Sequence, residues 1–326
     1  MDERLQVYRE AALKAVRYQL GYQLEDGGYI WEGYAEDAFH KQAYSWGLAG
    51  YAGNAHRLLT WVRDTRLQPD GRLTAYNSDV YKHSWFFQGA HRLARFDVTY
   101  PVMSFLLSCQ APCGGLPHFE GDPYLRSLAT CCTGLSALYF GRLDVAQRCG
   151  QWAISLLQQQ PDEGRFYYRT TRDGRLLTPD LDARNALCID TAKPKQDYWE
   201  VGLPLQLMCK LYQATGIGTY LDYAKRFFEF KLRCHEDAFT FVGSGKSSLG
   251  AALFYLCAGD RRARDAACAF GEFLVETQYP EGGWRDENEP DLLLIYIDHA
   301  AEFSIWLQEI CATLPAADAR WARCSP

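Results

Sequence analysis

Acidic and imidazole side chains recur in the loops and at the starts of apolar segments, and these are the group types that move protons in enzymes. We identify eight acid–base candidates: Asp37, His40, Asp79, His83, His118, Asp190, Glu200 and Asp298. A pair of carboxylates facing one cavity would suit glycoside hydrolysis. A single carboxyl in an apolar pocket, its pKa raised by desolvation, would suit protonation of a polyene. The competing explanation for each aspartate is a helix N-cap, a position that aspartate commonly occupies.

Large aromatic side chains are dense in the same stretches. Their faces stack on sugar rings, and they also stabilise cations and apolar polyenes. The competing explanation is packing between helices, because large rings are often buried. The candidate substrate-binding residues are Trp31, Tyr34, Tyr44, Trp46, Tyr81, Trp85, Phe86, Tyr124, Trp199 and Trp284.

The apolar segment 291–314 carries two carboxylates, Asp298 and Glu302, which are four residues apart and share one face of a helix. Polar groups on an otherwise apolar helix are costly unless they are paired or functional. We therefore expect one of the two to face a cavity, unless this part of the helix is solvated.

Two motifs that would imply a bound ligand are incomplete. The stretch 243–248, GSGKSS, resembles the end of a phosphate-binding loop, but Thr240 stands where that loop needs glycine. Cys188, Asp190 and the pair Cys234–His235 are suitable zinc ligands, but their spacing matches no recognised metal site. We expect no metal and no cofactor.

Composition narrows the class of protein. The chain has 326 residues, a formal net charge of −6 and 48% hydrophobic residues, which is enough for a large core. It has no long cluster of Lys and Arg, so we expect no nucleic-acid partner. The charged, amphipathic N-terminus and the lack of a long apolar run predict neither a signal peptide nor a membrane span. We expect a cytoplasmic protein whose twelve cysteines are reduced and mostly structural.

A repeated sequence pattern predicts the helices that must position these residues. An apolar helix, often ending near Gln, is followed by a turn rich in Asp, Glu and Gly and then by an aromatic residue or Leu. Six copies are aligned on Asp26, Asp70, Cys113, Glu163, Asp237 and Glu281, at spacings of 44, 43, 50, 74 and 44 residues. The long interval contains an insertion at 165–200, which has two prolines, a DG turn and alternating stretches. We interpret it as a loop or short hairpin that acts as a lid.

The helix before each turn is amphipathic, as at 145–160, whereas the segment after it is apolar or rich in small residues, as at 127–141 and 247–259. Each copy therefore predicts an outer helix, a glycine turn and an inner helix. We predict an all-α fold in which six such hairpins form an (α/α)6 toroid, with residues 1–326 as a single domain and with the insertion between the fourth turn and the fourth inner helix.

Helices that end near Gln, followed every forty-odd residues by acidic-Gly-Gly-aromatic turns such as 18–29 and 273–284, resemble the α/α-toroid superfamilies. These comprise terpenoid cyclases and prenyltransferases, with their Gln-and-Trp repeat, and six-hairpin glycosidases with related sugar epimerases. The resemblance covers about residues 5–315 and implies a fold rather than one activity.

Our leading interpretation is a cyclase or isomerase of natural-product biosynthesis. It would act on a small hydrophobic or partly oxygenated, terpenoid- or polyketide-like substrate by acid–base catalysis in an aromatic cavity. The alternative is a carbohydrate-active enzyme, namely a glycoside hydrolase, lyase or sugar epimerase. A third hypothesis is a non-catalytic binding scaffold. Two carboxylates facing one cavity would favour the glycosidase, and one buried carboxylic acid would favour the cyclase.

Overall fold

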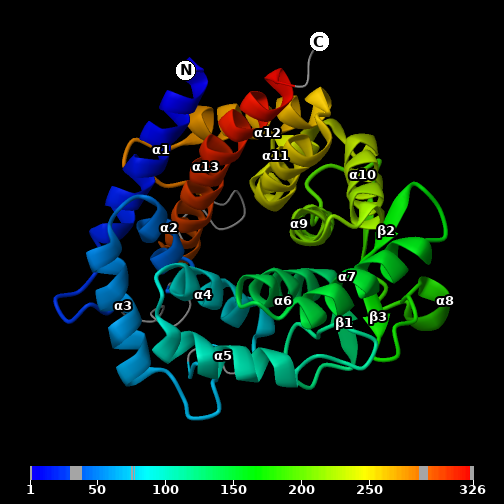
Figure 1. Cartoon of the computed structure of the whole chain (residues 1–326), viewed down its shortest axis with the longest axis horizontal. Coiled ribbons are helices and arrows are strands. Elements are labelled where there is room, and N and C mark those ends of the chain that lie inside the picture. Colours follow the sequence, from blue (N-terminus) through cyan, green and yellow to red (C-terminus); the bar gives the residue numbers. More distant parts are fainter. Residues whose placement is uncertain (1, 30–38, 75, 77, 286–292, 324–326) are drawn as a thin grey trace. The chain divides into compact units, whose positions relative to one another are not determined.

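The computed structural model describes residues 2–29, 39–74, 76, 78–285 and 293–323, and it is dominated by α-helices (Figure 1). Its internal contacts divide the chain into two units. The first unit comprises Met1–Ser108 and Gly271–Cys311, and the second comprises Cys109–Phe270 and Ala312–Pro326. Each unit is described here by itself.

The first unit begins with a run of helices from the N-terminal part of the chain and ends with segments from the C-terminal part. The N-terminal helices are α1 (Glu3–Leu20), α2 (Gln42–Leu48), α3 (Ala52–Thr65), α4 (Val80–Arg92) and α5 (Phe96–Ser108). Helices α12 (Arg261–Thr277) and α13 (Leu293–Ala322) each contribute residues to both units.

The second unit is built from helices and four short strands. Its helices are α6 (Ser127–Tyr139), α7 (Leu143–Gln158), α8 (Pro179–Asp182), α9 (Trp199–Thr215), α10 (Gly218–Arg233) and α11 (Gly245–Ala258), with the short 3-10 helices η1 (Glu236–Phe239) and η2 (Val242–Ser244). Strand β1 (Tyr124–Arg126) pairs with β3 (Arg169–Thr171), and β2 (Arg165–Tyr167) pairs with β4 (Cys188–Asp190), both antiparallel.

In the first, third and sixth copies the recurrent Gln and Gly fasten the turn to a neighbouring helix. Gln278 donates from Nε2 to the carbonyl of Gly282 in its own turn (2.9 Å) and to that of Ala11 in α1 (2.9 Å). Gly282 has a φ of 119°, and a Cβ there would lie 2.7 Å from the carbonyl oxygen of Lys14. Only glycine tolerates both conditions. The same pair of bonds joins Gln23 to Gly27 and Asn54, and Gln110 to Gly114 and Val145.

The fourth and fifth copies depart from this pattern. Gln160 binds both backbone groups of Tyr167, and the fifth turn is the 3-10 helix η1. The predicted insertion at 165–200 contains three of the four strands, all paired in the two small sheets. Tyr124 of β1 also donates to Asp182 in the insertion (2.5 Å). These contacts hold the insertion against the rest of its unit, and its action as a lid stays a prediction.

The helices predicted to be inner are buried along most of their length in the second unit. Helix α6 is buried from Ser127 to Ala137, and α11 from Gly245 to Tyr255. Helices α9 and α11 approach closely because Gly202 lies against the backbone of Ser247, where a Cβ would collide. Small residues therefore bring these helices together, as the sequence predicts.

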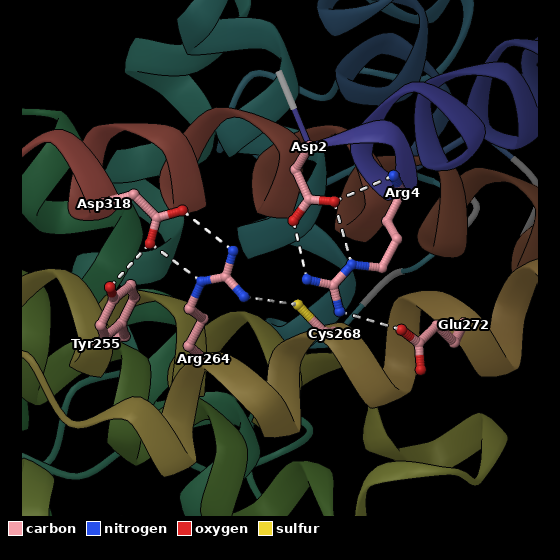
Figure 2. Close-up of polar contacts among 7 residues, drawn as sticks. All are labelled: Asp2, Arg4, Tyr255, Arg264, Cys268, Glu272 and Asp318. Carbon is pink, nitrogen blue, oxygen red and sulfur yellow. Dashed lines mark hydrogen bonds and ion pairs between the residues drawn. The ribbon is translucent and has the colours of Figure 1, made fainter.

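Polar pairs fix helix α12 within each unit, as Figure 2 shows. In the first unit, Arg4 donates to Glu272 of α12 (3.4 Å). In the second, Arg264 of α12 donates to Asp318 of α13 (3.0 Å), and Asp318 also accepts a bond from the hydroxyl of Tyr255 (2.8 Å). Over the residues described, none of the helices has the length and hydropathy that a membrane crossing requires.

Candidate functional site

A buried lysine gathers two carboxylates in the first unit. Lys41, at the start of α2, places its Nζ 2.6 Å from Asp298 Oδ2 and 2.6 Å from Glu302 Oε2, both on α13. The 298 and 302 positions share a helix face, as their four-residue spacing predicts. His40 Nε2 lies 3.5 Å from Asp298 Oδ1. Trp306 donates from its indole to Glu302 Oε1 (3.1 Å).

These contacts set the charge states. Burial lowers the pKa of Lys41, but Asp298 and Glu302 outweigh that effect and raise the pKa above its usual value. Burial raises the pKa of the Asp298 carboxyl. The charges of Lys41 and His40 lower it by more, so the net pKa is below the usual range. Asp298 is therefore ionised at neutral pH. Its side chain is 25% exposed, in contrast to 4% for Lys41.

One oxygen of Asp298 is unusual. Oδ1 is buried, and among the residues that the structure describes no donor makes a hydrogen bond to it. Buried polar atoms are nearly always satisfied, so an exception requires an explanation. Its contact with His40 Nε2, at 3.5 Å, is too long for a good hydrogen bond.

Aromatic rings surround the lysine. Trp85 of α4 lies beneath Lys41, whose Nζ is 5.7 Å from the ring centroid. Trp85 packs against Trp306 at 5.3 Å in an edge-on arrangement, and Tyr44 and Tyr81 contact Trp85 at 6.1 and 6.4 Å. Three of the aromatic candidates, Tyr44, Tyr81 and Trp85, thus lie close to the acid–base cluster; Tyr44 and Trp85 are buried, and Tyr81 is partly exposed.

Two other acid–base candidates in the first unit have contacts that hold the fold. Asp79 is the N-cap of α4 and accepts a bond from the backbone N–H of Lys82 (2.9 Å). His83 accepts a bond from the N–H of Leu73 at Nε2 (2.9 Å), and its Nδ1 lies 2.6 Å from the carbonyl of Asp79. Burial lowers the pKa of His83 to about 4, so the ring is neutral. Neither residue enters the site that we propose.

A second charged cluster lies within the second unit. Glu200, at the start of α9, has no exposed surface. It accepts bonds from Arg126 Nε (2.6 Å) and from the backbone N–H of Leu128 (2.9 Å). Burial raises the pKa of Glu200 to about 6, although Arg126 opposes the rise. Because both oxygens are engaged, Glu200 positions Arg126 and does not reach a substrate.

The remaining candidates of the second unit are spread over several elements. His118 lies near Arg126, with 3.5 Å between Nδ1 and Nη1. Tyr124 lies on β1, on the same small sheet as Arg126. Asp190 ends β4 and accepts a bond from the N–H of Ala192 (3.1 Å). Trp199 begins α9 and packs near Gly243.

Five aromatic candidates are buried, namely Tyr44, Trp46, Trp85, Phe86 and Trp284. Trp46 and Trp284 are buried, and their indole N–H groups donate to Gln19 and to the carbonyl of Leu274. Phe86 is buried against Phe39. Other candidates lie outside the described residues: Trp31, Tyr34 and Asp37.

The sequence analysis missed Lys41 and Arg126. A lysine directly after His40 and before an apolar segment was a signal, because a buried lysine needs an acidic partner and Asp298 and Glu302 needed a basic one. Arg126 gave no comparable signal, since its partner Glu200 is 74 residues away. No group of three or more His, Cys, Asp or Glu side chains that could hold a metal occurs among the described residues.

Comparisons with solved structures give the class of fold. An inactive variant of the family 76 α-1,6-mannanase of Salegentibacter sp., in complex with α-1,6-mannotetrose, is similar with a TM-score of 0.65 and 15% identity, covering 94% of this chain and 99% of that chain. A D-mannose isomerase has a TM-score of 0.66 and 13% identity, covering 96% and 98%. An unsaturated glucuronyl hydrolase specific for heparin has a TM-score of 0.65 and 8% identity, covering 99% of both.

No family model and no curated protein matches the sequence. The structural similarity establishes the fold: it is the six-hairpin α/α toroid that the repeat was predicted to form, and the predicted fold class is confirmed. The leading hypothesis of a terpenoid- or polyketide-like cyclase in natural-product biosynthesis is wrong, because the similar structures are carbohydrate-acting proteins. Aromatic rings and acidic groups fit both classes in kind, and the Gln-and-Gly repeat reflects the fold rather than the chemistry.

Proposed function

We propose that this chain is a carbohydrate-active enzyme that moves a proton on a sugar, with Asp298 as the base. The observation that supports this proposal is the ionised Asp298 carboxylate between Lys41 and His40, beside Trp85. A base of this kind needs a stable negative charge and a proton donor or acceptor nearby. Aromatic faces suit the apolar face of a sugar ring, and of the rings in this cluster Tyr81 is the partly exposed one.

The chemistry follows from the charge states. Asp298 removes the proton from the carbon beside a sugar carbonyl; the electron pair of that C–H bond forms the C=C bond of an enediolate, and the carbonyl π electrons move to the oxygen. Return of the proton to the former carbonyl carbon, with transfer of the neighbouring hydroxyl proton to the enediolate oxygen, completes an isomerisation. Protonation of the first carbon on its opposite face, by a proton from water, restores the carbonyl and completes an epimerisation. His40 is placed to exchange a proton with Asp298. Lys41 keeps the carboxylate ionised between turnovers.

A glycoside hydrolase is the second candidate, and the similarity to mannanase structures favours it. Two-carboxyl hydrolysis needs one protonated carboxyl as the acid. Lys41 opposes protonation of both Asp298 and Glu302, so the first-unit cluster suits that role less well. In addition, the mannanase variant described as inactive has two consecutive aspartates replaced, and this chain contains no Asp-Asp pair.

The test is activity on a panel of monosaccharides and oligosaccharides. Incorporation of deuterium from heavy water, followed by NMR, detects isomerisation and epimerisation, and release of reducing ends detects hydrolysis. We expect Asp298→Asn to lower kcat by about 10²- to 10⁴-fold, with an unchanged circular dichroism spectrum. Asp222→Asn, at an exposed position of α10, is the matched control and should leave kcat unchanged. Full activity of Asp298→Asn would exclude Asp298 as the base.

The predicted small-molecule partner is, in this proposal, a mono- or oligosaccharide substrate. We also retain the cytoplasmic location as a prediction. Its support is that eleven cysteines of the described residues are free, which fits a reducing compartment.

A further inference from the structure

Two arginines face each other across the small sheet of the second unit. In the antiparallel pairing of β1 with β3, Arg126 lies directly opposite Arg169. Directly opposed residues have Cβ atoms about 5 Å apart and point to the same face of the sheet. Like charges in this relation repel and destabilise a sheet. Glu200 offsets the charge of Arg126, so the charge that needs a compensating partner is that of Arg169.

The face that carries the arginines is the accessible one. Along β1 and β3 the central residues, Leu125 and Thr170, are buried, whereas the residues on either side of each are partly exposed. Because side chains alternate between faces, Tyr124 lies on the same face as Arg126 and Arg169. The arginines thus lie on the accessible face, with a tyrosine beside them.

Glu200 and Tyr168 hold the side chain of Arg126 in place. Its Nε is bound to the buried Glu200, and its guanidinium lies 5.6 Å from the centre of the Tyr168 ring. Its remaining contact in the described chain is the 3.5 Å approach of Nη1 to His118. The buried carboxylate at Nε and the aromatic ring fix the plane of the guanidinium group. Its terminal nitrogens therefore keep a constant direction.

Arg169 has still fewer partners. Its one hydrogen bond, from Nη1 to the side-chain oxygen of Asn185, is long at 3.4 Å, and no carboxylate of the described residues forms an ion pair with it. The nearby carboxylates are already engaged: Asp182 by the hydroxyl of Tyr124 (2.5 Å) and Asp197 by that of Tyr168 (2.8 Å). The charge of Arg169 is therefore not balanced by a direct partner.

We propose that Arg126 and Arg169 bind the anionic group, a carboxylate or a phosphate ester, of an acidic sugar. Planar guanidinium groups bind both anions through paired N–H donors, and two of them directed at one face suit a single oxyanion. An anion would also remove the repulsion between the two arginines. This inference rests on the proposed carbohydrate function and assigns to the second unit a binding site for acidic sugars.

The experiment compares three probes by isothermal titration: D-glucuronate, D-glucose 6-phosphate and D-glucose. We expect at least one of the two anionic sugars to bind at least about ten times more tightly than D-glucose, a ratio that corresponds to one good charge-assisted contact. The preference should shrink as salt is added, because screening weakens partly exposed charge pairs. A preference for D-glucuronate would indicate a carboxylate ligand, and a preference for D-glucose 6-phosphate would indicate a phosphate ligand.

Substitutions test the contribution of each arginine to binding. Arg169→Gln should abolish the preference for the anionic sugar, and Arg169→Lys should retain part of it because the charge remains. Arg126→Lys should weaken binding while keeping a positive charge beside Glu200. Arg175→Gln, at an exposed position of the same hairpin, is the matched control and should bind as the wild type does. Circular dichroism and thermal melting verify that each variant is folded.

Three results would overturn the inference. One is equal affinity for D-glucose and both anionic sugars, and the other is a preference that survives Arg169→Gln. Failure of both anionic sugars to bind would overturn it as well. In that case binding or turnover of neutral sugars from the broader panel would leave the proposed carbohydrate function standing, so the two failures are distinguishable.

Discussion

Lys41 decides which chemistry Asp298 can perform. A carboxyl in a largely buried site would by itself have a raised pKa and would serve as an acid. The ammonium 2.6 Å away reverses that shift and leaves a base. The two carboxylates on α13 were predicted to share a face, but the lysine that joins them lies 257 residues from Asp298. Sequence spacing within one helix cannot reveal a partner contributed by a distant segment.

Replacement of Lys41 should therefore change the pH profile. In Lys41→Met we expect the acidic limb of kcat/KM to move to higher pH, because the pKa of Asp298 rises once burial is no longer opposed by the ammonium. A profile of kcat/KM from acidic to neutral pH measures this. An acidic limb that does not move would show that Asp298 does not govern it.

The same replacement leaves two buried like charges, and removal of one partner of a buried ion pair costs about 3–5 kcal/mol. The double variant Lys41→Met/Glu302→Gln removes one of those charges. It should regain part of the lost free energy of unfolding, and it provides a second readout if the single variant is too unstable to assay.

His83 gives the protein a stability that depends on pH. Its pKa is about 4 in the fold and 6.5 in the unfolded chain, so the unfolded chain binds more protons between these values. Stability is therefore fully present above pH 6.5 and is lost as the pH falls towards 4. The difference amounts to about 3 kcal/mol at most, because each pKa unit corresponds to 1.36 kcal/mol.

Urea unfolding at pH 7 and at pH 4.5 tests this contribution of His83. We expect His83→Gln to be less stable than the wild type at pH 7, and to lose less free energy of unfolding between the two pH values. His56→Gln, at an exposed position of α3, is the control and should show the slope of the wild type. An equal slope for His83→Gln would contradict the assignment.

At the scale of elements, the repeat was predictable because one local arrangement, which we call the device, recurs: a Gln side chain that bonds to its own turn and to a neighbouring helix. A Gln and a Gly four residues later define a turn and its attachment, as in Gln110 with Gly114. The fourth copy also has this spacing, in Gln160 and Gly164, but there Gln160 binds Tyr167 across the start of the insertion. The fifth copy, at 227–239, has neither Gln nor Gly. The two small sheets escaped prediction because three-residue strands are too short for an alternating pattern to be recognised.

Gln278 should contribute measurably to stability through the device. In Gln278→Ala the carbonyls of Ala11 and Gly282 lose their donor, and each unsatisfied buried group costs about 1–3 kcal/mol. We therefore expect a loss of about 2 kcal/mol in the free energy of unfolding. Gln6→Ala, which removes an exposed bond to Glu10 on α1, should cost less than about 0.5 kcal/mol. Equal losses for the two variants would assign the device no stabilising role.

At the scale of the whole molecule, the fold was predictable and the substrate class was not. Six copies of one hairpin pattern give a closed set of helices, and that inference depends only on local signals. The choice between cyclase and carbohydrate-active enzyme depends on which polar groups meet. Lys41 with Asp298, and Arg126 with Arg169, come together only through the tertiary fold. Aromatic content also misled, since Trp46 and Trp284 fill the core of their unit.

The thiols offer a test of the fold across the whole molecule. Of the eleven cysteines that the structure describes, eight are buried, and Cys113, Cys188 and Cys234 are partly exposed. Burial raises the pKa of Cys149 to about 12 and that of Cys131 well above its usual value. Both effects suppress reaction, because the accessible thiolate is the reactive form. Pulsed alkylation followed by peptide mass spectrometry should label Cys113 first and the buried thiols only after unfolding, when all twelve react. Labelling of Cys131 or Cys149 in the native protein as fast as that of Cys113 would mean that α6 and α7 are not packed as described.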